Sequence, residues 1–465
     1  MGLTMNSNKL QRLKTILKEQ SPKIVLITLI LIFAFYSVFL ALNLQEAIIP
    51  DEPAHITFSK HFAQTIGIPE DVPQTINTGW YIQQNPFLNH WLNGRAINLL
   101  ELMVPSATDQ QILIFLRLIS VAYSIGTVFF CYLISKEIIK DVWWRLLPVF
   151  LLTNTLMFVF ISGGVSYDNL ANLLSMAALY FVVRVFNGKD FITNSLAWMI
   201  LIFLGTLVKF TILPLALFMG ILWLIFLLVR RKKIIFVKPG KFTQRLLFPI
   251  LLVIIFANLG IYGVNLLKYQ SVTPVCSDMF TAEQCALSPY VSRYNDLVLG
   301  HKLSIKESIG LGYPNPVEYV IDSWIPNMLY RIFGILGHKS YFPSHIIVFY
   351  RLFLLWITFL AFRYINKPSF TIYSLFCIFI LYASVLLYIN YNSELTYGFK
   401  QIAMQGRYIF PVIGSIYVLI SYVMTNINNR ILRLATLIFT IVLFFMGGPI
   451  KFLLNYNTTF FGWFI

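Results

Sequence analysis

Residues 24–43 read IVLITLILIFAFYSVFLALN, a run of twenty residues without a charged side chain. About 20 apolar residues in a helix cross a hydrocarbon core of roughly 30 Å. Ten further stretches are similar, and charged residues make up 12% of the chain, against about 25% in soluble proteins. The sequence therefore predicts an all-α integral membrane protein, a single polytopic domain over residues 1–465 with about eleven spans. The predicted spans are 24–43, 112–135, 146–162, 168–186, 192–208, 211–229, 247–266, 346–362, 370–389, 408–425 and 431–448.

The Lys and Arg residues predict the orientation of this bundle. Cationic side chains accumulate on the cytoplasmic side of membrane proteins, and alternating spans put 21 of the 35 Lys and Arg residues on the side of the N-terminus. This predicts a cytoplasmic N-terminus, retained as a signal anchor, and an extracytoplasmic C-terminus. Because the cations lie beside apolar runs, the net charge of +16 does not indicate nucleic-acid binding. The predicted cytoplasmic segments are 1–23, 136–145, 184–191, 230–246, 363–369 and 426–433.

Two predicted outer segments, 44–111 and 267–345, are too polar to cross the membrane and too long to be simple turns. Each is predicted to fold over the membrane surface, as long loops with functional roles do. Cys276 and Cys285 both lie in the second segment, where an oxidising compartment would permit a disulfide between them. No Cys or His spacing typical of a zinc site occurs in the sequence.

An acidic pair, Asp51 and Glu52, follows the first span in the sequence PDEPAH. One interpretation is a helix start, with Asp51 as the N-cap, Pro53 in the first turn and Glu52 favoured by the helix dipole. The other is a catalytic base at the membrane interface, where partial desolvation makes a carboxylate more basic. His55 would face the same side of a short helix, either as an ordinary interfacial residue or as a third catalytic residue.

Further polar residues fall on the outer side under the same topology. Lys209 and Arg407 are cations on the side where the charge bias disfavours them. One interpretation of Arg407 is a side chain that reaches the lipid headgroups. The other, which also applies to Lys209, is a cation that binds an anionic ligand, most simply a phosphate. Asp168 is either a structural partner of these cations or part of a binding site. The candidate substrate-binding residues are Asn85, Tyr167, Asp168, Lys209, Gln405, Arg407 and Tyr408.

A carboxylate and phosphate-binding cations at the outer membrane boundary favour group transfer from a lipid phosphate. The carboxylate would activate an acceptor hydroxyl, and the cations would stabilise the departing phosphate as its negative charge grows. A donor with a long isoprenoid tail would explain why the site lies at the edge of the bilayer.

These motifs resemble the GT-C glycosyltransferases, which use polyprenyl-phosphate-linked sugars and include the protein O-mannosyltransferases and the aminoarabinose transferase of lipid A. The segment PDEPAHITF fits the acidic pair of their first outer loop, QQNPFLNHWL is similar to their proline-containing helix start, and GTLVKFTILPLAL resembles their TK…LLP segment. Together, PDEPAH, SYDNLAN and QGRYIFP resemble an uncharacterised bacterial family of predicted GT-C membrane proteins.

The resemblance implies a GT-C bundle in the bacterial cytoplasmic (inner) membrane. It implies transfer of a sugar from a polyprenyl-phosphate-linked donor to an extracytoplasmic acceptor, which is a cell-envelope glycan, a lipid or a protein. Asp51 would be the catalytic base with Glu52 beside it, and Lys209 and Arg407 would bind the donor phosphate. The DxD motif of oligosaccharyltransferases is missing from the sequence, which argues against a divalent metal cofactor.

Two other functional classes fit part of the sequence. A lipid or glycolipid flippase, or another transporter, would place ionisable groups near the membrane midplane and on both faces, in two repeated halves. A glycan polymerase or ligase of the O-antigen type would use arginines of a large outer segment, where Arg293 and Arg331 lie. The gathering of polar residues on one side favours the glycosyltransferase.

Overall fold

The structure is a computed structural model that describes residues 7–230, 240, 243–289, 303–397, 404–459 and 462–465. Within these residues, ten helices are long and apolar enough to cross a membrane, and a bent pair of helices would make an eleventh span. The prediction of an all-α membrane bundle with about eleven spans is therefore confirmed. The spans are formed by α1 (Ser7–Asn43), α5 (Asp109–Ile138), α8 (Tyr167–Phe186), α9 (Phe191–Val208), α10 (Leu213–Arg230), α19 (Ser344–Tyr364), α20 (Phe370–Tyr397), α21 (Phe410–Thr425), α22 (Arg430–Met446) and by α11 (Phe248–Asn258), which is the central part of the span Arg245–Tyr269.

The predicted span 146–162 is a broken helix. It consists of η1 (Trp144–Leu146) with α6 (Leu147–Thr153), followed by α7 (Leu156–Ser162), and the helix axis bends by 65° between the two halves. At the break, the Asn154 side chain donates to the Phe150 carbonyl at 2.8 Å and the Thr155 hydroxyl to that of Leu151 at 2.8 Å. Side-chain bonds of this kind compete with the helical backbone, which explains why an apolar segment bends here.

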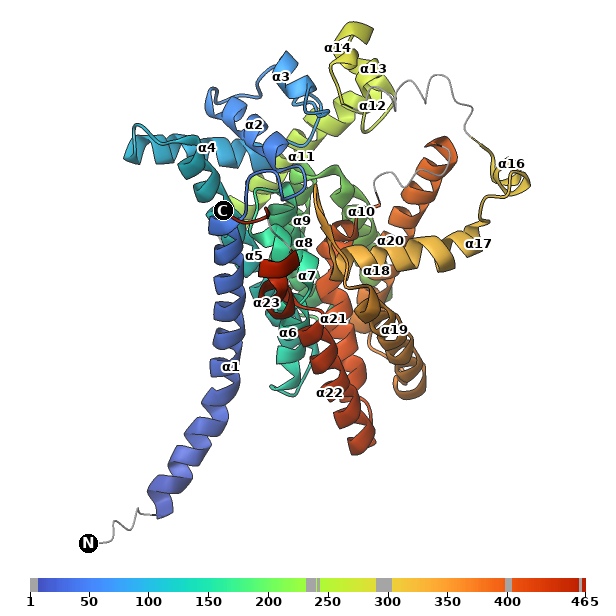
Figure 1. Cartoon of the computed structure of the whole chain (residues 1–465). Coiled ribbons are helices and arrows are strands. Elements are labelled where there is room, and N and C mark those ends of the chain that lie inside the picture. Colours follow the sequence, from blue (N-terminus) through green and yellow to red (C-terminus); the bar gives the residue numbers. More distant parts are fainter. Residues whose placement is uncertain (1–6, 231–239, 241–242, 290–302, 398–403, 460–461) are drawn as a thin grey trace.

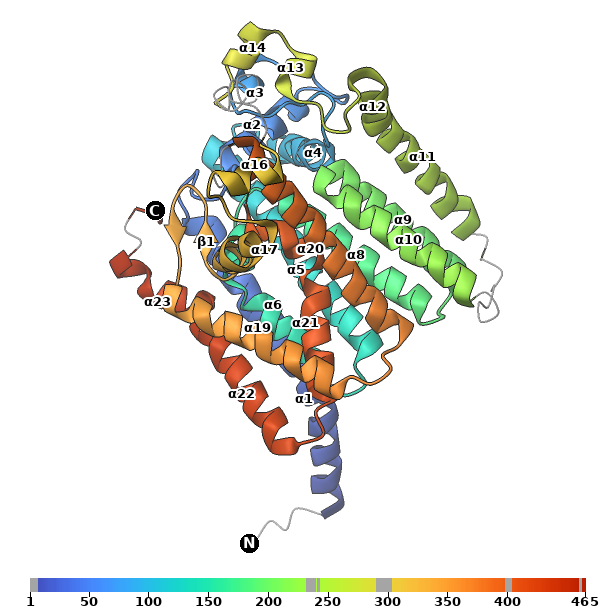
Figure 2. The same ribbon diagram turned by 90° about the vertical axis from the view of Figure 1, so that its right-hand side faces the viewer.

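The central helices α8 and α21 are the most buried of the candidate spans, with 78% and 72% of their most apolar windows inside the bundle. Helix α8 packs against α5, α9 and α21, and Figure 2 shows α5, α6 and α21 in the middle with α1, α9, α10, α19 and α22 around them. Small residues on α8, including Ala171, Ser175 and Ala178, are fully or almost fully buried. Small side chains allow helices to approach closely within a membrane.

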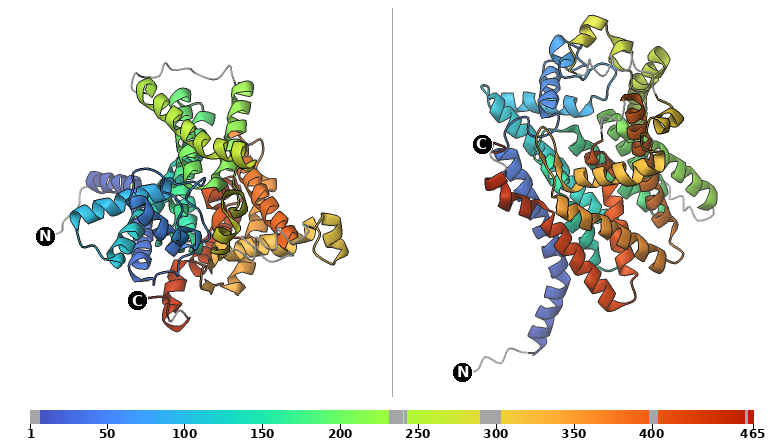
Figure 3. Two further views of the ribbon diagram at one scale, coloured as in Figure 1. Left: turned by 90° about the horizontal axis from the view of Figure 1, so that it is seen from above. Right: turned by 45° about the vertical axis from the view of Figure 1, so that its right-hand side comes forward.

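Shorter elements gather at one end of the bundle, which we call the capped end (Figure 1). The first outer segment contributes α2 (Glu52–Ala63), α3 (Pro73–Ile76) and α4 (Leu88–Met103), and η5 (Leu259–Gly263) and α12 (Val264–Tyr269) extend α11 towards them. Viewed from above, the blue helices α2–α4 and the yellow-green α11–α14 segment lie over this end of the bundle (Figure 3). The remaining short elements are η2 (Phe210–Ile212), η4 (Thr243–Leu247), α13 (Cys276–Met279), α14 (Ala282–Ala286), α16 (Ile305–Gly310), α17 (Pro316–Glu318), η6 (Tyr319–Trp324), α18 (Ile325–Phe333), β1 (Ile335–Leu336), β2 (Ser340–Tyr341), η7 (Gly406–Ile409) and α23 (Pro449–Thr459).

The C-terminal residues lie near the end of α1 at Asn43, far from its start at Ser7 (Figure 1). The last residues pair with the segment that follows α1: Leu44 forms a bridge with Phe464, and the Gln45 amide donates to the Trp463 carbonyl at 2.9 Å. These contacts hold the C-terminal residues at the capped end, far from the start of α1.

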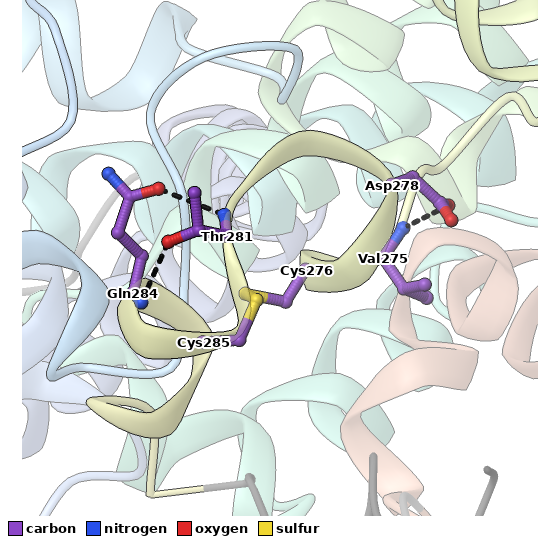
Figure 4. The surroundings of a disulfide bond; sticks show 6 residues. All are labelled: Val275, Cys276, Asp278, Thr281, Gln284 and Cys285. Atoms are coloured by element: carbon purple, nitrogen blue, oxygen red, sulfur yellow. Dashed lines mark hydrogen bonds between the residues drawn. A yellow bond between two sulfur atoms is a disulfide. The ribbon is translucent and has the colours of Figure 1, made fainter.

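A disulfide joins Cys276 and Cys285 in the second outer segment, with their Cα atoms 5.8 Å apart. It links the short helices α13 and α14, whose first turns are held by side-chain capping bonds from Asp278 and Thr281 (Figure 4). Both cysteines are buried in an apolar cluster with Tyr81 and Ile76 of the first outer segment. The disulfide region is therefore packed directly against the segment that carries α2 and α3.

Candidate active site

Asp51 lies immediately before α2, at the capped end. Its backbone is in the left-handed region with φ 63°, a conformation that Asp tolerates better than most residues. The Asp51 side chain makes no capping hydrogen bond; instead its Oδ2 accepts a hydrogen bond from Arg407 Nη2 at 2.5 Å. The helix-start interpretation thus describes the backbone of this segment, whereas the carboxylate itself points to a residue 356 positions along the chain.

Four ionised side chains form a continuous row of opposite charges. Asp51 pairs with Arg407, and Arg407 Nε lies 3.4 Å from Asp168 Oδ2, within ion-pair range but without hydrogen-bond geometry. The other oxygen of Asp168 accepts a hydrogen bond from Lys209 Nζ. Arg407, Asp168 and Lys209 are buried, while the Asp51 side chain is 29% exposed. Buried ions are tolerated when they are paired in this way, and Asp51 is the member of the row that is open to solvent.

Two tyrosines enclose the cations of this row. Lys209 Nζ lies 4.6 Å from the centre of the Tyr167 ring and 4.2 Å from that of Tyr408, and the Arg407 guanidinium lies 5.7 Å from the Tyr408 ring. Ring faces attract cations at these distances. Lys209 reaches this position because its backbone is extended, with φ −153° and ψ 128°, between the end of α9 and the start of η2.

Glu52 has a different environment from its neighbour. Its side chain is completely buried, Oε1 accepts from Arg117 Nε at 2.9 Å and from the Val165 amide at 2.9 Å, and Oε2 accepts from Arg117 Nη2 at 2.6 Å. Arg117 also donates to backbone carbonyls on the other side of the turn, those of Ala41, Leu44 and Gln45. Glu52 therefore fixes the turn that carries Asp51, and its engaged oxygens do not match the catalytic role expected for it.

Sequence reasoning did not identify Arg117 as a site residue. It is a charged residue within an otherwise apolar span, and intramembrane charges are functional candidates by default, so a signal was present. Its partner Glu52 lies 65 residues away, and only the packing of α5 against the end of α1 brings the two together.

His55 is buried beside a second histidine that the sequence analysis did not single out. His55 Nδ1 and His90 Nε2 are 3.0 Å apart, and the His55 ring meets the edges of Trp80 and Tyr167 at centroid distances of 5.0 and 4.6 Å. Burial lowers the pKa of His55 to about 3 and also lowers the pKa of His90. Both imidazoles are therefore neutral near pH 7, and His55 supports the Tyr167 ring without carrying a charge.

A cavity of about 270 Å³ adjoins the row of charges. Lys209, Tyr167 and His90 form part of its wall, together with Trp80 and Asn85 of the first outer segment. The Asn85 amide donates to the Tyr81 carbonyl at 3.0 Å, which holds it at the cavity edge. A second cavity of about 240 Å³ is mostly apolar and shares Phe210 and Thr273 with the first; its other lining residues are Thr211, Leu213, Pro214, Val272, Tyr382, Val385, Leu386 and Ile389.

The segment before α21 completes the site. The side-chain oxygen of Gln405 is buried without a hydrogen-bond partner in the described part of the chain. Gly406 packs against the backbone of Arg331 in α18, so closely that a Cβ atom would overlap it. Arg331 itself donates to Asn327 Oδ1 at 2.8 Å, and Arg293 lies outside the described residues.

The structure thus brings most of the predicted site residues to one place. Contacts in this region involve Asp51, His55, Tyr167, Asp168, Lys209, Arg407 and Tyr408, and Asn85 lines the same cavity as Lys209. Over the residues that the structure describes, no three His, Cys, Asp or Glu side chains are grouped so as to hold a metal ion.

No protein-family profile and no curated protein sequence matches this chain. Among solved structures, it is similar to ArnT from Cupriavidus metallidurans in the apo state, with 12% identity and a TM-score of 0.46 over 89% of this chain and 62% of that one. It is also similar to the oligosaccharyltransferase AglB from Archaeoglobus fulgidus in complex with an inhibitory peptide and a dolichol-phosphate, with 15% identity and a TM-score of 0.48 over 95% of this chain and 59% of that one. The chain spans about three fifths of the length of these enzymes.

Proposed function

We propose that the chain is a membrane-bound glycosyltransferase of the GT-C type, which moves a sugar from a polyprenyl-phosphate-linked donor to a hydroxyl group of an extracytoplasmic acceptor. The observation that carries this proposal is the row Asp51–Arg407–Asp168–Lys209 at the capped end of the bundle. It combines two cations suited to a phosphate with one carboxylate open to solvent.

Phosphate binding would rearrange this row at its exposed end. Asp168 contacts both cations and is buried with them, so it keeps Lys209 and Arg407 in place whether or not a ligand is bound. A donor phosphate would compete with Asp51 for the Arg407 guanidinium, whose fork of donors suits phosphate oxygens. The Asp51 carboxylate would then lose its cationic partner and become available as a base.

The transfer step follows from this exchange. Asp51 would accept the proton of the acceptor hydroxyl while the oxygen of that hydroxyl forms a bond to the anomeric carbon of the sugar. The bond from that carbon to the phosphate oxygen would break at the same time, and the electron pair would leave with the polyprenyl phosphate. Lys209 and Arg407 would stabilise the growing negative charge on the phosphate, and attack from the opposite face would invert the anomeric centre.

The apolar environment suits a lipid-linked donor. The second cavity begins at Phe210, directly after Lys209, and is lined mostly by apolar side chains of α10 and α20. The first isoprene units of the donor would lie there while its phosphate meets Lys209, and the rest of the chain would extend into the bilayer. With the N-terminus in the cytoplasm, as the Lys and Arg bias predicts, the capped end and the site would be extracytoplasmic, in the bacterial inner membrane.

The distribution of buried charge favours a transferase over a flippase or transporter. In the described segments, the pairs Glu52–Arg117 and Asp168–Lys209 are buried, and Asp51 pairs with the buried Arg407; all lie at the capped end. The pair Lys189–Glu137, beyond the other end of α8, is partly exposed. A transporter would instead place such groups near the membrane midplane, between two repeated halves.

The test is a transfer assay with the full chain, purified in a detergent without a sugar headgroup. The protein is mixed with a panel of synthetic undecaprenyl-phosphate-linked hexoses and with a bacterial envelope extract of lipids and glycans that supplies acceptor hydroxyls, and release of undecaprenyl phosphate is followed by mass spectrometry. Asp51→Asn should lower the rate about 10²–10⁴-fold, the usual contribution of a general base. Asp109→Asn, on an 85% exposed side chain paired with Lys60, is the matched control and should retain the rate. Full activity of Asp51→Asn would refute the assigned base, and no turnover of any donor would refute the function.

A further inference from the structure

The outer wall of the 270 Å³ cavity is built from two segments, residues 79–87 and 272–275, which we call the collar. They belong to different outer segments of the sequence. Both segments line the cavity together with Lys209, Tyr167 and His90. The other lining residues are Phe58, Phe62, Val208 and Phe210.

The two parts of the collar are fastened together at two points. At one, the fully buried Asn265 amide donates to the carbonyls of Gln84 and Val272, at 2.8 and 3.1 Å. At the other, the Tyr81 ring packs against Phe280 with a centroid distance of 5.1 Å, in the apolar cluster that holds the disulfide. Figure 4 shows the disulfide and the capping bonds that order this region. The collar is therefore a preformed wall.

Trp80 is the central aromatic side chain of this wall. Its ring lies 5.3 Å from that of Tyr167 and 5.0 Å from that of His55, centre to centre. The turn that carries it is held by the Asp71 carboxylate, which accepts from the Ile82 amide at 2.8 Å and from the Gln83 amide at 3.0 Å. Trp80 is thus placed before any ligand arrives.

The lining of the cavity selects for a neutral ligand with both apolar and hydroxyl surfaces. Lys209 is the one ionised side chain among the lining residues. Asp168 pairs with it, and in the proposed reaction the donor phosphate takes up its remaining charge, so that no further cation is left for an anionic sugar. His90 is neutral because burial lowers its pKa. The remaining lining residues are aromatic or aliphatic, apart from amide and hydroxyl groups such as those of Asn85 and Thr273. The cavity volume is about 270 Å³, close to the lower end of small-molecule sites and enough for one sugar ring. A sugar ring presents C–H faces to aromatic side chains and hydroxyl groups to the polar ones.

We propose that the collar, with Trp80 and Tyr167 as its stacking surface, is a binding site for one uncharged carbohydrate ring. This rests on the proposed function and specifies its substrate class: a neutral sugar, in preference to a uronic acid or another anionic residue. Such a ring could come from the acceptor glycan or from the sugar of the donor.

Saturation-transfer difference NMR on the full chain in lipid nanodiscs tests this site. The probes are methyl hexopyranosides of glucose, mannose and galactose, with methyl glucuronide as the anionic counterpart of equal ring size. At least one neutral glycoside should give a signal that Trp80→Ala lowers fivefold or more. Trp143→Ala, on a half-exposed tryptophan outside the cavity lining, is the matched control and should leave the signal unchanged. The Cys276→Ala/Cys285→Ala double variant should also weaken the signal, by loosening the wall while leaving every lining side chain present.

Added lipids identify the source of the ring. If the site takes the acceptor, undecaprenyl phosphate and an undecaprenyl-phosphate-linked hexose both leave the glycoside signal intact. If it takes the donor sugar, the linked hexose removes the signal and undecaprenyl phosphate alone does not. Either result supports the site. A wild-type protein that binds undecaprenyl phosphate but gives no neutral-glycoside signal, or a signal equal in Trp80→Ala, overturns it. Failure to bind undecaprenyl phosphate would instead contradict the proposed function.

Discussion

Replacing Arg117 with Met should destabilise the protein more than any exposed ion-pair change. The substitution keeps an apolar side chain of similar length on α5 but removes the guanidinium that pairs with Glu52 at 2.6 and 2.9 Å. Glu52 would remain fully buried with the Val165 amide as its described hydrogen-bond donor. Three backbone carbonyls, of Ala41, Leu44 and Gln45, would also lose a donor.

The magnitude follows from the burial of the pair. Removing one partner of a completely buried ion pair costs about 3–5 kcal/mol, because the other charge is left uncompensated. Removing both partners is often close to neutral. Arg117→Met should therefore lower the free energy of unfolding by about 3–5 kcal/mol, and the double variant Glu52→Gln/Arg117→Met should recover most of that loss.

The assay is unfolding of the purified protein in mixed micelles with increasing sodium dodecyl sulfate, followed by thiol labelling of the buried Cys131. The matched control is Lys60→Met, which breaks an ion pair with Asp109 whose side chains are 39% and 85% exposed. That change should cost less than about 1 kcal/mol. If Arg117→Met is as stable as Lys60→Met, or if the double variant is no more stable than the single one, Arg117 does not hold the turn that carries Asp51.

Two further predictions concern the same region. The pKa of His55 is lowered to about 3 from its ordinary 6.5, so between these pH values the unfolded chain binds a proton at His55 and the folded chain does not. The free energy of unfolding should therefore be highest above pH 6.5 and should fall as the pH drops towards 3, by up to ~1.4 kcal/mol per pH unit for one group. Unfolding curves at pH 7, 6, 5 and 4 measure this slope, which His55→Asn should reduce; an unchanged slope would contradict a buried, neutral His55. Gly406→Ala would force a Cβ into the backbone of Arg331 and so shift η7, which carries Arg407. Because misplacement of a site residue by about 1 Å can cost 10²-fold in rate, this variant should lower donor turnover at least tenfold. Gly310→Ala, where a Cβ meets open space, should be neutral in the same assay, and equal turnover of the two variants would show that the close packing at Gly406 does not position Arg407.

The comparison of Asp51 with Glu52 shows where sequence reasoning stops. Both are acids, they are adjacent, and both follow the first span. Nothing in their local sequence says that one carboxylate meets Arg407 while the other is enclosed by Arg117. Likewise, His90 and Trp80 occur in segments recognised as outer loops, but their contacts with His55 and Tyr167 depend on how α2, α4 and α8 meet.

The sequence by itself determined the class of the protein, the positions of its spans and the residues from which the row of charges is drawn, because hydropathy and charge bias are properties of short continuous segments. Only the tertiary structure decided which charge pairs with which, that the span 146–162 is broken, and that two outer segments join into one wall beside Lys209. Those pairings link residues 65 and 356 positions apart. Partners at such separations are selected by the packing of the whole bundle, which no local pattern encodes.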